Sequence, residues 1–193
     1  GYVKMKINIE INNIIQDIVA DSLKIDKYCM IMNCYKMVDI SKDEKWQKNF
    51  NSFYVIRRDK DWQDIYYNFF EKNKFNNDLT FENIITYLYE KTGLIEASYS
   101  SKLLATVNSN KPIWDQNVLK NLGMKQEGKT KIEQISNSII LYEEIVEWYN
   151  EFMKTGQAAD CINAFNKILP KYREISDVKK IDFLLWKIRY RGK

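Results

Sequence analysis

Three kinds of side chain that can take part in chemistry follow one another in a single stretch of the sequence. Ser98 and Ser101 stand near the start of a predicted helix, shortly after Gly93. Uncovered amides at such a helix start attract anions, and phosphate is the commonest of these. Lys102 then supplies an amine, which becomes nucleophilic when desolvation lowers its pKa, and Asp115 supplies a carboxylate. The stretch therefore combines a phosphate-binding feature with an amine and an acid.

Each of the two ionisable residues also has a simpler interpretation. Asp115 precedes a predicted helix over residues 116–122, where an aspartate commonly caps the free amides and stays ionised. An N-cap role and a catalytic role for Asp115 are compatible. Lys102 has the alternative of a solvated lysine on the helix surface. The sequence leaves both alternatives open.

Aromatic and basic residues near this stretch fit contacts with a nucleic acid. Trp114 and Tyr99 can stack on a base, although Trp114 equally fits a place in the core. Arg57 and Arg58 can hold a phosphate or form a solvated corner with neighbouring aspartates. The lysines that we expect near phosphates are Lys111, Lys120 and Lys125.

The order of these elements resembles the helix-hairpin-helix DNA glycosylase superfamily, which includes endonuclease III and the 8-oxoguanine glycosylases. The resemblance covers residues 80–123: helix, tight turn, helix with an early lysine, loop, Pro112-Ile113-Trp114-Asp115, helix. It implies a helix-hairpin-helix centre that binds double-stranded DNA and flips a damaged base out of the stack. It also implies that Asp115 assists cleavage of the N-glycosidic bond and that Lys102 attacks the sugar carbon. No cofactor and no metal are implied.

The sequence departs from that family at the hairpin turn. Leu94-Ile95-Glu96-Ala97 replaces the glycine-bracketed turn, and a glutamate there opposes phosphate binding. If Thr106 is used to align the motif, the position of the family's lysine falls on Ser98. A second hypothesis is therefore a non-catalytic helical module that binds DNA or another protein.

Composition limits the class of protein. With 193 residues, 45% hydrophobic and 14% aromatic, the chain has enough apolar material for a large core. We expect a single domain over 1–193, with lobes 1–78 and 79–193 as the alternative. Thirty basic and 26 acidic residues give a net charge of +4, which permits a nucleic-acid partner without requiring one. The absence of histidine excludes Ser/His and Cys/His catalysis and most zinc chemistry.

The cysteines and the hydropathy pattern predict a cytoplasmic protein. The three cysteines form no C-x-x-C pair, which favours reduced, buried thiols. No apolar run is long enough to span a membrane, and the start of the chain does not resemble a secretion signal.

Helical periodicity and few breakers predict an all-α, compact multi-helix domain with about nine helices. The repeat from Ile7 onward predicts a first helix to Leu23, and a capping box predicts a helix start at Ser41. Residues 53–56 are the best strand candidate. Thr80 is expected to cap the next helix, and Gly93 to end it in a left-handed conformation.

The rest of the chain predicts three further helices. A long amphipathic helix is expected from Ile132 to Phe152, ending at Gly156. Two helices over residues 158–169 and 176–190 follow, with Pro170 between them.

Overall fold

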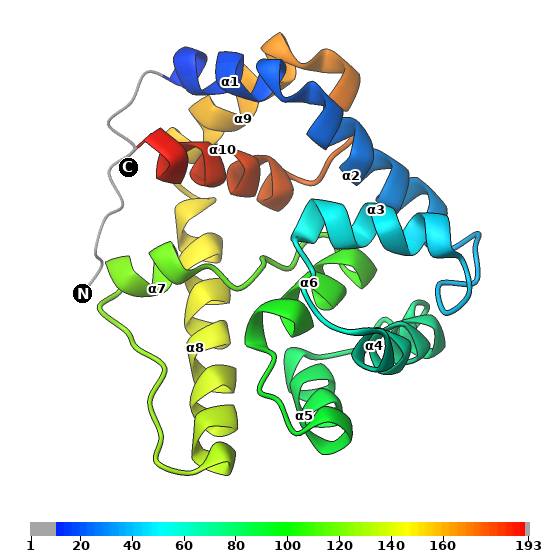
Figure 1. Cartoon of the computed structure of the whole chain (residues 1–193). Coiled ribbons are helices and arrows are strands. Elements are labelled where there is room, and N and C mark those ends of the chain that lie inside the picture. Colours follow the sequence, from blue (N-terminus) through cyan, green and yellow to red (C-terminus); the bar gives the residue numbers. More distant parts are fainter. Residues whose placement is uncertain (1–10, 192–193) are drawn as a thin grey trace. The chain divides into compact units, whose positions relative to one another are not determined.

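The computed structural model describes residues 11–191, and within this range the chain forms ten α-helices, one 3-10 helix and no strand (Figure 1). The prediction of an all-α fold is confirmed. The chain divides into two compact units, one made of Gly1–Ser22 with Ser109–Lys193 and the other of Leu23–Asn108. The alternative lobe boundary at residue 78 falls inside the second unit.

The first unit joins the two ends of the described chain. Its elements are α1 (Ile11–Ala20), α7 (Gln116–Asn121), α8 (Lys131–Phe152), α9 (Gly156–Ile168), η1 (Pro170–Tyr172) and α10 (Asp177–Arg191). Helix α1 packs against both α9 and α10, as Figure 1 shows, and α7 packs against α8. Ile15, Phe165 and Ile181 are fully buried in this unit. Burial of such side chains is the main source of stability, so the beginning and the end of the chain depend on each other.

The second unit is built around aromatic side chains. Its helices are α2 (Ser22–Cys34), α3 (Glu44–Tyr54), α4 (Lys60–Asn73), α5 (Phe81–Thr92) and α6 (Ala97–Val107). The Trp46 ring lies 5.3 Å from that of Phe50 and 5.4 Å from that of Phe70, centroid to centroid. The Trp46 indole N–H donates to the Ile31 carbonyl at 3.2 Å. Rings of α3 and α4 thus share one core, and a hydrogen bond ties α3 to α2.

Several predicted helix boundaries are confirmed. Thr80 and Asn83 form a reciprocal capping box at the start of α5, and Gly93 ends this helix with φ 74°. Gly123, with φ 68°, follows α7. Pro170 separates α9 from α10 by opening the 3-10 helix. Local chemistry sets these boundaries, which is why the sequence predicts them.

Other boundaries differ from the predictions in the first half of the chain. The first helix breaks at Asp21, between α1 and α2, and Ile7 lies outside the described residues. Asp43 caps α3 in place of Ser41, because the Asp43 carboxylate accepts the Trp46 N–H at 2.9 Å. The Ser41 hydroxyl instead donates to Asp39 at 2.6 Å.

The strand candidate and the end of the long helix are also corrected. Phe53 and Tyr54 form the last turn of α3, where their rings are buried, and Val55 ends this helix in the left-handed region with φ 55°. Helix α8 ends at Phe152, and Gly156 begins α9, which Thr155 caps. Gly156 begins a helix and does not end one, because the Thr155 hydroxyl before it accepts the Ala158 N–H, a free amide at the start of α9.

No helix within residues 11–191 combines the length and the apolar character that crossing a lipid bilayer requires.

Candidate functional site

Lys102 lies on α6 with its ammonium directed at the end of α3. The ammonium donates to the Tyr54 carbonyl at 2.8 Å and lies 5.3 Å from the centre of the Tyr99 ring. Tyr54 is the last residue of α3, and carbonyls at a helix end carry partial negative charge. Lys102 therefore stabilises the end of a neighbouring helix within the second unit.

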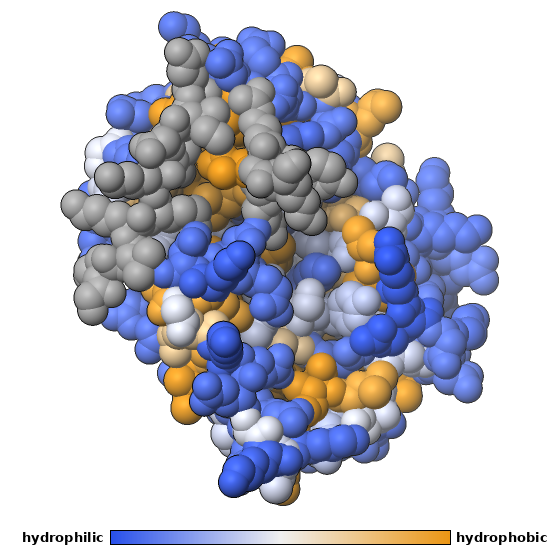
Figure 2. All heavy atoms as spheres, turned by 60° about the vertical axis from the view of Figure 1, so that its left-hand side comes forward, coloured by the Kyte–Doolittle hydropathy of each residue, from blue (hydrophilic) through white to orange (hydrophobic). Residues whose placement is uncertain are grey.

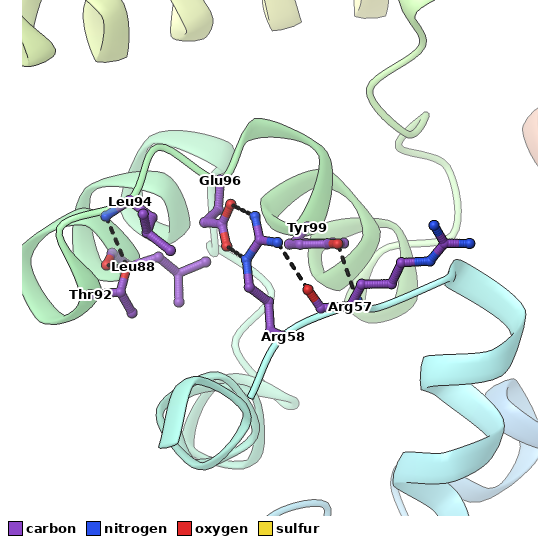
Figure 3. A network of polar contacts seen from close by, with 7 residues as sticks. All are labelled: Arg57, Arg58, Leu88, Thr92, Leu94, Glu96 and Tyr99. Carbon is purple, nitrogen blue, oxygen red and sulfur yellow. Dashed lines mark hydrogen bonds and ion pairs between the residues drawn. The ribbon is translucent and has the colours of Figure 1, made fainter. Parts of the chain in front are cut away.

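Glu96, at the junction of α5 and α6, forms a two-pronged ion pair with Arg58 (Figure 3). The guanidinium Nε and Nη2 each donate to one carboxylate oxygen at 2.8 Å. Glu96 is only 5% exposed, and its carboxylate does not cap α6. The hydrogen bond with Glu96 raises the pKa of Arg58. Parallel bonds of this kind are strong and geometrically specific.

Tyr99 lies beside two cations of the second unit. The Arg58 guanidinium is 4.9 Å from the ring centre, and the Lys102 ammonium is 5.3 Å from it. The Tyr99 hydroxyl accepts the Arg57 backbone N–H at 3.3 Å (Figure 3). The Tyr99 carbonyl accepts the Tyr66 hydroxyl at 2.7 Å. The ring expected to stack on a base is thus held by cation–π contacts and hydrogen bonds to its own unit.

The Ser101 hydroxyl, near the start of α6, bonds to the backbone of its own helix. Ser101 is fully buried, and its hydroxyl donates to the Ser98 carbonyl at 2.8 Å. In the preceding turn, the Thr92 hydroxyl donates to the Leu88 carbonyl at 2.6 Å and accepts the Leu94 N–H at 3.1 Å (Figure 3). Thr92 and the left-handed glycine after it shape a turn without the glycine bracket of the glycosylase family.

Asp115 belongs to the first unit, where it caps α7 as expected. One carboxylate oxygen accepts the N–H groups of Asn117 at 2.8 Å and Val118 at 3.2 Å. Asp115 is 1% exposed, and the adjacent Trp114 is 6% exposed. The Tyr142 hydroxyl of α8 donates to the Pro112 carbonyl at 2.7 Å, which fixes the approach to the cap. Trp114 therefore occupies the core position that the sequence offered as its alternative role.

The basic residues expected near phosphates are distributed over both units. Lys120 and Lys125 are exposed in the first unit and Lys111 is half-buried there, whereas Arg57 is exposed in the second. Arg58 is held in its ion pair with Glu96. Hydrophilic residues cover most of the face in Figure 2, and hydrophobic residues form smaller patches between them.

Buried lysines are a feature that sequence reasoning missed. Lys74 is 6% exposed and donates to the Val38 carbonyl at 2.6 Å, and Lys180 is 2% exposed and donates to the Arg173 carbonyl at 2.7 Å. Like Lys102, each ammonium meets a backbone carbonyl, and each also lies near a carboxylate three residues earlier, Glu71 at 2.8 Å from Lys74 and Asp177 at 3.6 Å from Lys180. Together these contacts satisfy a charge that is costly to bury. Amphipathic patterning gives no signal for the carbonyl contacts, because those acceptor atoms belong to the backbone.

No three carboxylate or thiol groups within residues 11–191 cluster closely enough to hold a metal ion. Comparisons with protein-family models, with curated proteins and with solved structures found no match. The glycosylase resemblance therefore stays a prediction.

Proposed function

We propose that the chain is a non-catalytic helical module that binds double-stranded DNA through phosphate contacts. The observation that carries this proposal is the position of the Lys102 ammonium, 2.8 Å from the Tyr54 carbonyl. A nucleophilic amine must be uncharged, whereas a carbonyl at a helix end favours the charged ammonium. Catalysis by Lys102 would require breaking this contact and losing its stabilisation.

The position of Asp115 supports the same conclusion. Its carboxylate accepts two amides of α7 and is 1% exposed. An acid that assists departure of a base has to approach the sugar, and the buried cap accounts for Asp115 without such a step.

The partner is inferred from charge. Residues 111–131 carry five lysines and two acidic residues, and one of the two, Asp115, is buried. Lys120 and Lys125 are exposed on this segment. Lysines that neutralise DNA phosphates release counterions, so their contribution weakens as salt is added.

Fluorescence anisotropy with labelled double-stranded DNA over a series of salt concentrations tests this proposal. Lys120→Gln combined with Lys125→Gln should weaken binding for all DNA sequences and reduce the salt slope by about two, roughly one for each lost contact. The matched control is Lys45→Gln with Lys48→Gln on α3, which removes the same charge from exposed positions of the second unit. Absence of binding at low salt, or equal losses in the two double variants, would reject the proposal.

Borohydride trapping on DNA with abasic sites separates this proposal from the glycosylase hypothesis. If Lys102 stays bonded to the Tyr54 carbonyl, the unmodified chain should give no more covalent adduct than Lys102→Met, because any background trapping then comes from exposed surface lysines such as Lys120. An adduct that forms with the unmodified chain and disappears in Lys102→Met would instead establish a lyase.

A further inference from the structure

Helix α8 carries an exposed apolar stripe in its first half. Ile132 is 72% exposed and Ile140 is 53% exposed, and Ser136 lies between them. Residues four apart in a helix lie on the same face, so these three form one continuous stripe. Glu143 and Glu147 extend it toward the helix end, and both are exposed.

The charges along α8 are strongly asymmetric. Its last twelve residues, 141–152, hold four glutamates and no basic residue, and its last turn has no cation. One of these glutamates, Glu151, is paired with Lys154 just beyond the helix at 3.1 Å. Carboxylates near the C-terminus of a helix oppose the helix dipole, so the other three gain from an external positive partner. Lys129 and Lys131, both exposed, stand at the opposite end of the helix.

We propose that this stripe binds the same stripe of a second copy of the chain, with the two α8 helices antiparallel and Ser136 at the two-fold axis. Ser136 lies midway between Ile132 and Ile140, so the axis places each isoleucine against the other isoleucine of the second copy. Lys129 precedes Thr130, the N-cap of α8, so it lies just beyond the helix start, and the same register brings this start near Glu143 of the second copy. The small serine allows the helices to approach closely.

Charge selects the antiparallel orientation over the parallel one. A parallel pair would place the two glutamate-rich halves together, and their charges would repel. An antiparallel pair places each glutamate-rich half beside the lysines of the other copy, and the two helix dipoles then attract each other. A contact of about two helical turns on each side is smaller than a stable dimer interface, which buries roughly 1,200–2,000 Å². The dimer is therefore weak, concentration-dependent and sensitive to salt. It does not depend on DNA binding.

Disulfide trapping captures such a weak dimer. Ser136→Cys should form a covalent dimer under mild oxidation, because residues at the axis of a close helix pair come within the Cα separation of about 4.4–6.8 Å that a disulfide spans. Asn150→Cys lies on the same exposed face but far from the axis, so it should give no more dimer than the parent chain with its three cysteines. Equal dimer from the two variants, or none from Ser136→Cys, would overturn the proposal.

Second-site changes in the Ser136→Cys chain test the register. Ile132→Asp should reduce trapping severalfold, whereas Leu23→Asp, at an 82% exposed apolar position near the start of α2, should leave it unchanged. Lys129→Glu should also reduce trapping, and adding Glu143→Lys should restore it. Failure of this charge reversal, with circular dichroism showing intact helices, would exclude the proposed pairing.

Discussion

At the scale of single residues, charged side chains of the second unit join its helices through an ion pair and hydrogen bonds. Glu96 is 5% exposed and is compensated by the Arg58 guanidinium, which also lies against the rings of Trp62 and Tyr99. Lys102, on α6, donates a hydrogen bond to the Tyr54 carbonyl at the end of α3. A buried charge that loses its partner is expensive, so these pairs constrain which substitutions the unit tolerates.

Arg58→Ala should lower the free energy of unfolding by about 1–2 kcal/mol, because Glu96 then keeps a buried charge without its hydrogen-bonded partner. The 34% exposure of the Arg58 side chain keeps the loss below that of a fully buried pair. Urea unfolding measures the effect. Arg57→Ala is the control, since its side chain is exposed and its backbone N–H is retained. Equal losses for the two arginines would contradict a structural role of the ion pair.

At the scale of elements, short helices of this chain depend on their ends. Helix α7 has only six residues, too few for much stability of its own, and Asp115 satisfies two of its free amides. Helix α5 ends at Gly93 in the left-handed backbone conformation, which is unfavourable for residues that carry a side chain. Both features are local, and both can be tested by single substitutions.

Asp115→Ala should destabilise the protein by about 1–2 kcal/mol, since it leaves two amides of α7 without their acceptor. Asp115→Asn keeps a capping oxygen and should lower the melting temperature only slightly, with DNA binding unchanged. Thermal unfolding and the anisotropy titration read out these effects. Loss of a base-excision activity in Asp115→Asn, with stability retained, would point to catalysis.

Gly93→Ala should cost about 1 kcal/mol, because φ 74° is unfavourable for an L-residue even though no atom within 4 Å obstructs the added carbon. Gly156→Ala is the matched control, also with open space but inside α9 and without a positive φ. This substitution should be neutral or stabilising by up to about 1 kcal/mol. Chemical denaturation distinguishes the two; similar effects would show that conformation at Gly93 is not limiting.

At the scale of the whole molecule, burial of ionisable groups sets its behaviour in alkali. Burial raises the pKa of Tyr66 and Tyr67 in the second unit and of Tyr142 in the first, and it raises that of Cys161 to about 11. Raised values for acidic groups mean that the native state favours their neutral, protonated forms. The stability they contribute is complete below their ordinary pKa values and falls as pH rises above them.

The free energy of unfolding should therefore decline as pH increases from 9 towards 11. Across this range the Cys161 thiol ionises in the unfolded chain but stays largely protonated in the native one. The buried tyrosines should remain un-ionised until the protein unfolds. Absorbance at the phenolate band, followed together with circular dichroism, checks both statements. Complete and reversible ionisation of all 13 tyrosines while the helices persist would contradict the buried positions.

The topology at this scale could not be read from the sequence. Helix α1 packs on α9 and α10, so the first unit contains both ends of the described chain, and the second unit is formed by the residues between them. Composition indicated a large core but not which segments share it, because apolar periodicity identifies the buried face of a helix and not its neighbour.

The sequence by itself determined those features that depend only on residues close together along the chain. Helical periodicity predicted the all-α fold, and short-range chemistry predicted the cap at Thr80, the stop at Gly93 and the cap at Asp115, since each needs only hydrogen bonds or torsions within a few residues. Tertiary structure alone decided that Lys102 meets the Tyr54 carbonyl and that Glu96 meets Arg58, because those partners lie far away along the chain. The residue types showed which side chains could react or bind, and only the packing of the chain determined which of them already bond to other parts of the protein.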